Sequence, residues 1–134
     1  MPIHKHNPFT VVTMFEEEVA HYTGSPYAIS TSNCTNSLLL SCIYCDVKDK
    51  DVTIPKKTYI SVPQAIKHAG GNVKFESVKW EGIYQLKPFP IYDAAKRFTS
   101  GMYIKNTIMC LSFHLKKAIA VSYTHLTLPT NREV

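Results

Sequence analysis

The sequence predicts an α/β domain with a mostly parallel sheet flanked by helices. Short runs rich in β-branched residues alternate with longer apolar stretches at helical spacing, and polar or glycine-containing turns separate them. This alternation is typical of βαβ units, in which crossover helices join parallel strands. With 134 residues, of which 45% are apolar and 19% charged, the chain is long enough for one domain with a hydrophobic core.

The individual elements follow from the local patterns along the chain. A first amphipathic helix is expected at 9–22, where Val12, Phe15 and Val19 recur at helical spacing. Further along we expect a β-type run at 27–30, a helix through SLLLSCIYC, a strand at 51–55, a helix at 62–70, a strand at 72–78, and two strands over PIYDAA and IMCLSFH.

Composition and charge argue against several classes of function. The net charge of +5 comes from lysines scattered along the chain without an aromatic-interleaved basic motif, so we expect a solvated surface and no nucleic-acid partner. No apolar run approaches the roughly 20 residues of a membrane span, and the N-terminus lacks the order of a signal peptide. We therefore expect a cytoplasmic protein without membrane contact.

Cys42 and Cys45 form a C-x-x-C pair, which can belong to a redox or zinc module. They fall within the apolar run SLLLSCIYC, and no second pair of cysteines or histidines stands at metal-ligand spacing. We therefore predict buried thiols in a helix and no metal site. A redox or zinc module is the alternative, and it would require exposed thiols.

The C-terminal segment does not continue the α/β pattern. Residues 121–130, VSYTHLTLPT, resemble the in-frame translation of a transposase adapter used in preparing sequencing libraries. We therefore interpret 1–120 as a truncated domain and 121–134 as a non-native tail, which is excluded from the fold prediction. A genuine C-terminal strand in this segment is the alternative.

Three clusters can carry chemistry. A polar turn opens the second helix, where the N–H groups of a helix N-terminus can hold a phosphate, and Thr35 and the amide of Cys34 are candidates. Asp93 ends an apolar strand, where a carboxylate can pair with a cationic ring nitrogen. Lys116 and Lys117 end another, and a partly desolvated lysine can form a Schiff base with an aldehyde cofactor. Helix capping and turn chemistry are the alternatives for the first two clusters.

In this order, the clusters resemble the DegT/DnrJ/StrS-type sugar-nucleotide aminotransferases, a branch of the fold-type I pyridoxal-phosphate enzymes. FEEEVAHYTGSPYAISTSNCTNSL is similar to the family's FEEE-like helix, its G-x-x-Y-A strand and its S-G-T or C-T-N turn. IPKKTYISVPQA is similar to an aromatic-containing loop, YDAA to a D-A-A strand end, and SFHLKK to an S-F-H-x-x-K motif. The resemblance runs from about Asn7 to Ala120.

The resemblance implies roles for the matching residues. Lys117 would be the Schiff-base lysine, and Asp93 would bond the pyridine nitrogen of pyridoxal 5′-phosphate and keep it protonated. Tyr59 would stack its ring on the cofactor, with a core position as the alternative. The phosphate contacts would be Cys34, Thr35 and Ser112.

Two residues depart from the family pattern. Many members have Gln or His three residues after the aspartate, where this chain has Lys96. The usual glycine of S-G-T is Cys34. We therefore expect the tuning of the cofactor and the approach of its phosphate to differ from those of other members.

The implied reaction is pyridoxal-phosphate-dependent transamination of a nucleotide-linked keto sugar, with glutamate as amino donor, in amino-sugar and surface-polysaccharide biosynthesis. A lysine at position 117 favours transamination, because sugar dehydratase relatives carry histidine there; such a dehydratase is an alternative. Family members are homodimers with active sites at the subunit interface, so we expect this fragment of the cofactor-binding large domain to be inactive alone. A non-enzymatic α/β fragment is a further alternative.

Overall fold

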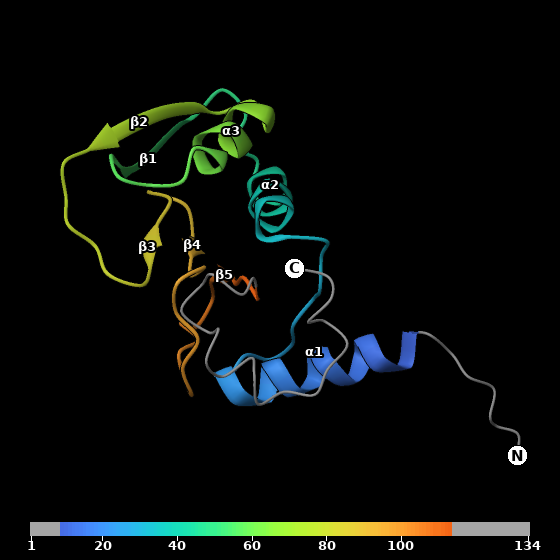
Figure 1. Cartoon of the computed structure of the whole chain (residues 1–134). Coiled ribbons are helices and arrows are strands. Elements are labelled where there is room, and N and C mark those ends of the chain that lie inside the picture. The colour runs from blue at the N-terminus through green and yellow to red at the C-terminus, as the bar shows by residue number, and fades with distance from the viewer. Residues whose placement is uncertain (1–8, 114–134) are drawn as a thin grey trace, which may run out of the picture. The chain divides into compact units, whose positions relative to one another are not determined.

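The computed structural model describes residues 9–113, which form two compact units (Figure 1). Of the described residues, the smaller unit contains 9–30 together with 99–105, and the larger unit contains 31–98 together with 106–113. The segment interpreted as a tail lies outside the described residues. No helix between residues 9 and 113 has the length and apolar character that a membrane crossing requires.

The smaller unit is built on helix α1 (Phe9–Thr23), which confirms the first predicted helix. Gly24 ends the helix in a left-handed conformation with φ of 83°, and its N–H donates a 2.9 Å hydrogen bond to the carbonyl of Ala20. The segment 99–105 returns to this end of α1, where the N–H of Gly101 donates to the carbonyl of Tyr22 at 2.9 Å. Two segments far apart in sequence are thereby joined.

The β-type run expected at 27–30 is wrong, because these residues form no strand. The N–H and the hydroxyl of Ser30 both donate to the carboxylate of Glu16 in α1, at 2.7 and 2.8 Å. A side chain therefore satisfies the backbone N–H that a neighbouring strand would otherwise bond.

In the larger unit, helices and strands follow the predicted order. The elements are α2 (Cys34–Tyr44), β1 (Asp51–Pro55), α3 (Ser61–His68), β2 (Asn72–Glu76), β3 (Tyr84–Gln85), β4 (Ile91–Asp93) and β5 (Ile108–Cys110). The side chain of Asn33 caps α2 by accepting a 2.8 Å hydrogen bond from the N–H of Asn36. Within the βαβ unit formed by β1, α3 and β2, the N–H of Gly71 donates to the carbonyl of Ile66 at 2.9 Å, which ends α3 before β2 begins.

The five strands form a parallel pair and a three-stranded sheet. β1 pairs with β2 in parallel, and β4 lies between antiparallel β3 and parallel β5. Thr53 of β1 and Lys87 exchange two backbone hydrogen bonds of 2.8 and 3.0 Å, which link the two sheets. Two of the three strand pairings are parallel, as the βαβ pattern predicted. The single mostly parallel sheet is wrong, because the strands divide into two sheets and the unpredicted strand β3 adds an antiparallel pairing, so the fold is small and mixed α/β.

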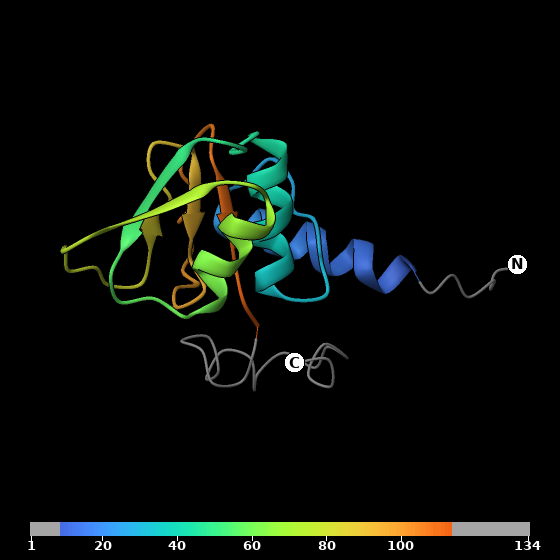
Figure 2. The ribbon, with the colours of Figure 1, turned by 90° about the horizontal axis from the view of Figure 1, so that it is seen from above.

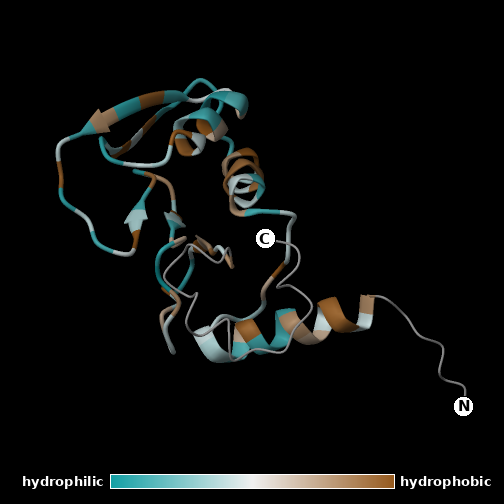
Figure 3. Ribbon diagram, viewed as in Figure 1, coloured by the Kyte–Doolittle hydropathy of each residue, from teal (hydrophilic) through white to brown (hydrophobic). Residues whose placement is uncertain are grey.

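One hydrophobic core joins the helices and strands of the larger unit. Ile54 of β1, Ile66 of α3 and Leu86 are fully buried. Leu38 and Cys42 of α2 belong to the same cluster. α2 contacts β4 and β5, and α3 contacts α2 and β2, as Figure 2 shows from above. In Figure 3, hydrophobic segments alternate with hydrophilic ones along the helices, as expected for helices with one buried face.

Candidate functional site

Asp93 is the last residue of β4, which confirms its predicted position at the carboxyl end of a strand. Only 5% of its surface is exposed. Its register partners are Tyr84 on β3 and Cys110 on β5, so the three side chains share one face of the sheet. The Tyr84 hydroxyl donates a 2.6 Å hydrogen bond to Oδ2 of Asp93, and the N–H of Ala95 donates one of 3.0 Å to Oδ1. Two donors from different segments thus fix the orientation of the carboxylate.

Tyr84 is held in its protonated form. Burial raises the pKa of its hydroxyl, and the charge of Asp93 and the hydrogen bond to it raise the pKa further. The thiols of Cys34 and Cys110 act on the same hydroxyl and raise its pKa in the same direction. At neutral pH, Tyr84 therefore remains a hydrogen-bond donor to the carboxylate.

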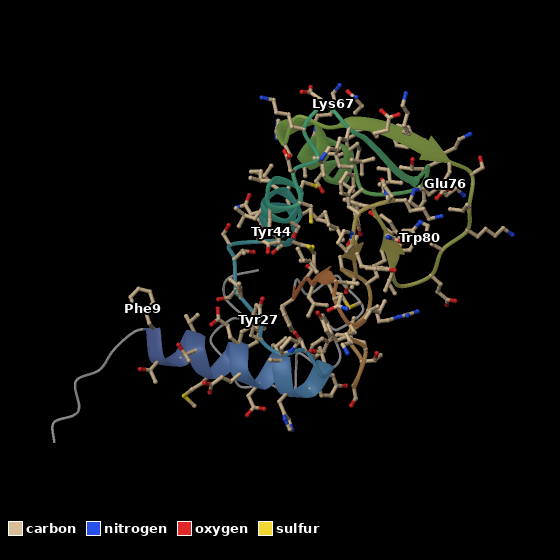
Figure 4. The ribbon with its side chains drawn as sticks, turned by 180° about the vertical axis from the view of Figure 1, so that it is seen from behind. Phe9, Tyr27, Tyr44, Lys67, Glu76 and Trp80 are labelled. Carbon is tan, nitrogen blue, oxygen red and sulfur yellow. The ribbon has the colours of Figure 1, made fainter. Side chains whose placement is uncertain are left out.

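A small pocket in the larger unit opens onto this carboxylate. Its lining includes Tyr59, Trp80, Gly82, Tyr84, Asp93 and Lys96. The rings of Trp80 and Tyr84 lie 4.6 Å apart between centroids at a tilt of 59°, and the Trp80 indole N–H donates to the carbonyl of Lys57 at 2.8 Å. Figure 4 shows Trp80 beside the three-stranded sheet. The pocket therefore combines aromatic rings with one buried negative charge.

Lys96 brings a positive charge to the same pocket. Its Nζ atom lies over the rings of Tyr59 and Trp80, at 5.5 and 5.8 Å from their centroids. Within the part of the chain that the structure describes, no acidic side chain forms an ion pair with it. Lys96 is thus placed by cation–π contacts in a pocket that already contains a carboxylate.

Two of the residues predicted for the cofactor, Asp93 and Tyr59, line this pocket together. Tyr59 is 50% exposed, so the alternative of a core position is wrong. Sequence reasoning missed Tyr84 and gave Trp80 no role. Trp80 could have been suggested as a pocket residue, because it is the only tryptophan of the chain and lies in the connection between two strands.

The residues predicted for the phosphate lie in two places. Cys34 and Thr35 form the first turn of α2, and Cys34 packs against the hydrophobic core. Helix capping was the alternative role for this polar turn. Asn33 is the N-cap residue of α2, so Thr35 is not the capping residue. Ser112 follows the end of β5 by two residues. Lys117 lies outside the described residues.

The prediction of two buried thiols in a helix is confirmed for Cys42 and wrong for Cys45. Cys42 is buried in α2, Cys45 is half-buried just after it, and both are free thiols. Burial raises the pKa of Cys42 to about 11, with a smaller contribution from Cys45. In residues 9–113, no three Cys, His, Asp or Glu side chains are grouped to hold a metal ion. Cys42 therefore has the environment of a structural rather than a reactive thiol.

The fold and the pocket together describe a small mixed α/β domain in which a buried carboxylate at the end of a strand and several aromatic rings line one pocket. The model of the DegT/DnrJ/EryC1/StrS aminotransferase family matches residues 7–110. The chain belongs to this family, which confirms the resemblance seen in the sequence. Comparisons with curated proteins and with solved structures gave no match.

Tyr84→Phe is expected to lower the free energy of unfolding by about 1–3 kcal/mol, because it removes a donor from a buried carboxylate. Tyr92→Phe is the matched control, since Tyr92 lies on β4 and its hydroxyl makes only a 3.5 Å contact with Gln85. Urea unfolding followed by circular dichroism measures both variants. Equal losses would contradict the importance of the bond to Asp93.

In the native protein, Cys42 and Cys110 are expected to resist alkylation at about pH 8, since little thiolate forms there. Burial raises the pKa of Cys110 to about 12, although the Ser41 hydroxyl opposes this. The stability gained by burying both thiols should be present below their ordinary pKa of 9.0 and lost as the pH rises towards 11 and 12. Mass mapping of alkylated cysteines over time, with urea-unfolded protein as control, measures this. Rapid native labelling of both would refute their burial.

Proposed function

We propose that this chain is the cofactor-binding part of an enzyme that acts, as a homodimer, in pyridoxal-phosphate-dependent transamination of a nucleotide-linked keto sugar, with glutamate as amino donor, in amino-sugar and surface-polysaccharide biosynthesis, and that the chain alone is inactive in this reaction. Membership of the DegT/DnrJ/EryC1/StrS family supports a sugar aminotransferase-type function. The observation that carries the cofactor assignment is the buried carboxylate of Asp93 in a pocket lined by aromatic rings.

The residues of this pocket fit a cationic heteroaromatic ring. A carboxylate with little access to water interacts strongly with a nearby positive charge, because few water molecules screen it. Asp93 keeps acceptor capacity beyond its two hydrogen bonds, since each carboxylate oxygen has a second lone pair. The rings of Tyr59, Trp80 and Tyr84 offer apolar surface for a flat ligand. When bound, pyridoxal phosphate would supply an electron sink for the carbon that gains or loses the amino group.

Asp93 would hold the proton on the ring nitrogen throughout the reaction. The hydrogen bonds from Tyr84 and from the N–H of Ala95 keep the carboxylate in one orientation, so it needs no rearrangement as charge develops. Tyr84 can serve in this way because its raised pKa keeps its hydroxyl protonated. Tyr59 would position the ring by stacking against it.

The phosphate would lie at the N-terminus of α2. This end of an 11-residue helix carries the positive end of the helix dipole, which favours an anion near Cys34 and Thr35. α2 contacts β4, the strand that Asp93 ends, and Cys34 packs against the buried cluster that includes Tyr84, so the start of α2 lies near these residues. Ser112, just after β5, would add a hydroxyl contact.

Lys117 would supply the amine that holds the aldehyde group of the cofactor and then moves a proton to or from the substrate carbon. It belongs to the segment SFHLKK, which begins at Ser112, two residues after the end of β5, the strand that pairs with β4. Lys116 would be its surface neighbour.

Borohydride reduction of the chain mixed with pyridoxal phosphate is expected to leave a pyridoxyl group on Lys117, as located by mass mapping. Lys117→Ala should abolish this labelling, whereas the adjacent control Lys116→Ala should keep it. Asp93→Asn should weaken binding of the cofactor roughly tenfold or more, because a charged hydrogen bond is lost. Labelling spread over surface lysines, or equal labelling in both lysine variants, would contradict the proposed site.

A further inference from the structure

We propose that the outer edge of β2 pairs with β2 of a second copy of this chain, antiparallel and centred on Phe75, so that the two copies share one continuous sheet. This contact goes beyond the proposed function, because no residue of β2 lines the pocket around Asp93. It is a second surface for self-association, separate from any contact between subunits at the active site.

β2 is an edge strand with one side open. Among the described strands only β1 pairs with it, and Figure 1 shows no strand on its other side. The N–H of Asn72 donates to the carbonyl of Lys50, just before β1, at 2.8 Å. Because the direction of hydrogen bonding alternates along a strand, the N–H and carbonyl groups of Val73 and Phe75 are directed away from β1. The edge therefore presents main-chain donors and acceptors to a further strand.

An exposed aromatic ring stands on this edge. Phe75 is 52% exposed, although its register partner on β1, Ile54, is fully buried. Val73, two residues earlier on the same face, packs against the hydrophobic core. Phe75 therefore continues the apolar face of the sheet to its edge, where the ring meets water. A neighbouring strand with an aromatic residue directly opposite would cover this ring.

The charges of β2 favour another β2 as the neighbouring strand. Lys74 and Glu76 lie on the face opposite to Phe75, because side chains alternate along a strand. In two antiparallel copies centred on Phe75, Lys74 stands opposite the partner's Glu76, and Glu76 stands opposite the partner's Lys74. Two reciprocal ion pairs can therefore form across the interface.

Both charges can take part in these pairs. Between residues 9 and 113, no acidic side chain forms an ion pair with Lys74, which is exposed. Glu76 already pairs with Lys87, whose Nζ atom lies 3.1 Å from Oε2. The other carboxylate oxygen of Glu76 remains as an acceptor for the partner's Lys74.

Only one register satisfies the main chain and the charges together. Phe75 directs both of its main-chain groups outward, so it can exchange two hydrogen bonds with the partner's Phe75. A shift by two residues keeps the hydrogen-bonding pattern, but it sets Lys74 opposite the partner's Lys74 in one direction, or Glu76 opposite the partner's Glu76 in the other. Like charges directly opposite each other are destabilising, so the sequence of β2 selects the register centred on Phe75.

The test measures self-association of the full chain by sedimentation velocity over a range of protein concentrations. Lys74→Glu should raise the dimer Kd roughly tenfold or more, because two attractions across the interface become repulsions. Phe75→Pro removes an outward N–H without removing a bond to β1, and it should weaken the dimer similarly. Lys105→Glu makes the same change of net charge in the smaller unit and should leave the Kd unchanged. Circular dichroism confirms that each variant is folded.

A mixture of two charge variants tests the register itself. Lys74→Glu and Glu76→Lys each set like charges opposite each other in their own dimers, but one chain of each kind restores both attractive pairs. With one variant labelled with nitrogen-15, native mass spectrometry should therefore find mixed dimers in preference to either homodimer.

Three results would overturn the inference. These are a chain that stays monomeric at every concentration, a dimer whose Kd Lys74→Glu leaves unchanged, and random mixing of the two charge variants. None of them bears on the proposed function, which the pyridoxyl labelling of Lys117 tests separately.

Discussion

The hydrogen bond from the Tyr84 hydroxyl to the Asp93 carboxylate organises the pocket of the larger unit. A charge buried this far is strongly destabilising unless donors surround it, and here β3 provides one and the turn after β4 provides the other. The antiparallel pairing that aligns Tyr84 with Asp93 also brings the connection before β3, with Trp80, to the carboxylate. The pairing that provides a hydrogen-bond donor for the Asp93 carboxylate therefore also places the rings of Trp80 and Tyr84 in the lining of the pocket.

Much of the fold could be predicted because its signals are local. The runs that predict α2, β1, α3 and β2 overlap those elements and miss their bounds by three residues or fewer, except that β1 is matched at both ends. β3 contains only two residues, which is too short for an alternating pattern to be recognised. The run at 27–30 has strand-like composition, but the side chain of Glu16 replaces a partner strand there.

The candidate site could be predicted only in part, for a different reason. Asp93 and Tyr59 stand in motifs that the family resemblance identifies, and both line the pocket. The contributions of Tyr84 and Trp80 depend on an antiparallel pairing between segments that no local pattern announces. The sequence identified Lys96 only as a departure from the family motif. Its contacts with the rings of Tyr59 and Trp80 could not be predicted without the fold.

The proposed mechanism depends on a protonated ring nitrogen held by Asp93. Nitrogen NMR of the full chain with pyridoxal phosphate isotopically labelled at its ring nitrogen observes this proton state directly. We expect the chemical shift of a protonated pyridine in the unsubstituted chain and a shift towards the neutral value in Asp93→Asn, since the amide cannot stabilise the positive charge. A neutral ring nitrogen in the bound, unsubstituted chain, or a shift that Asp93→Asn does not change, would contradict the role assigned to this carboxylate.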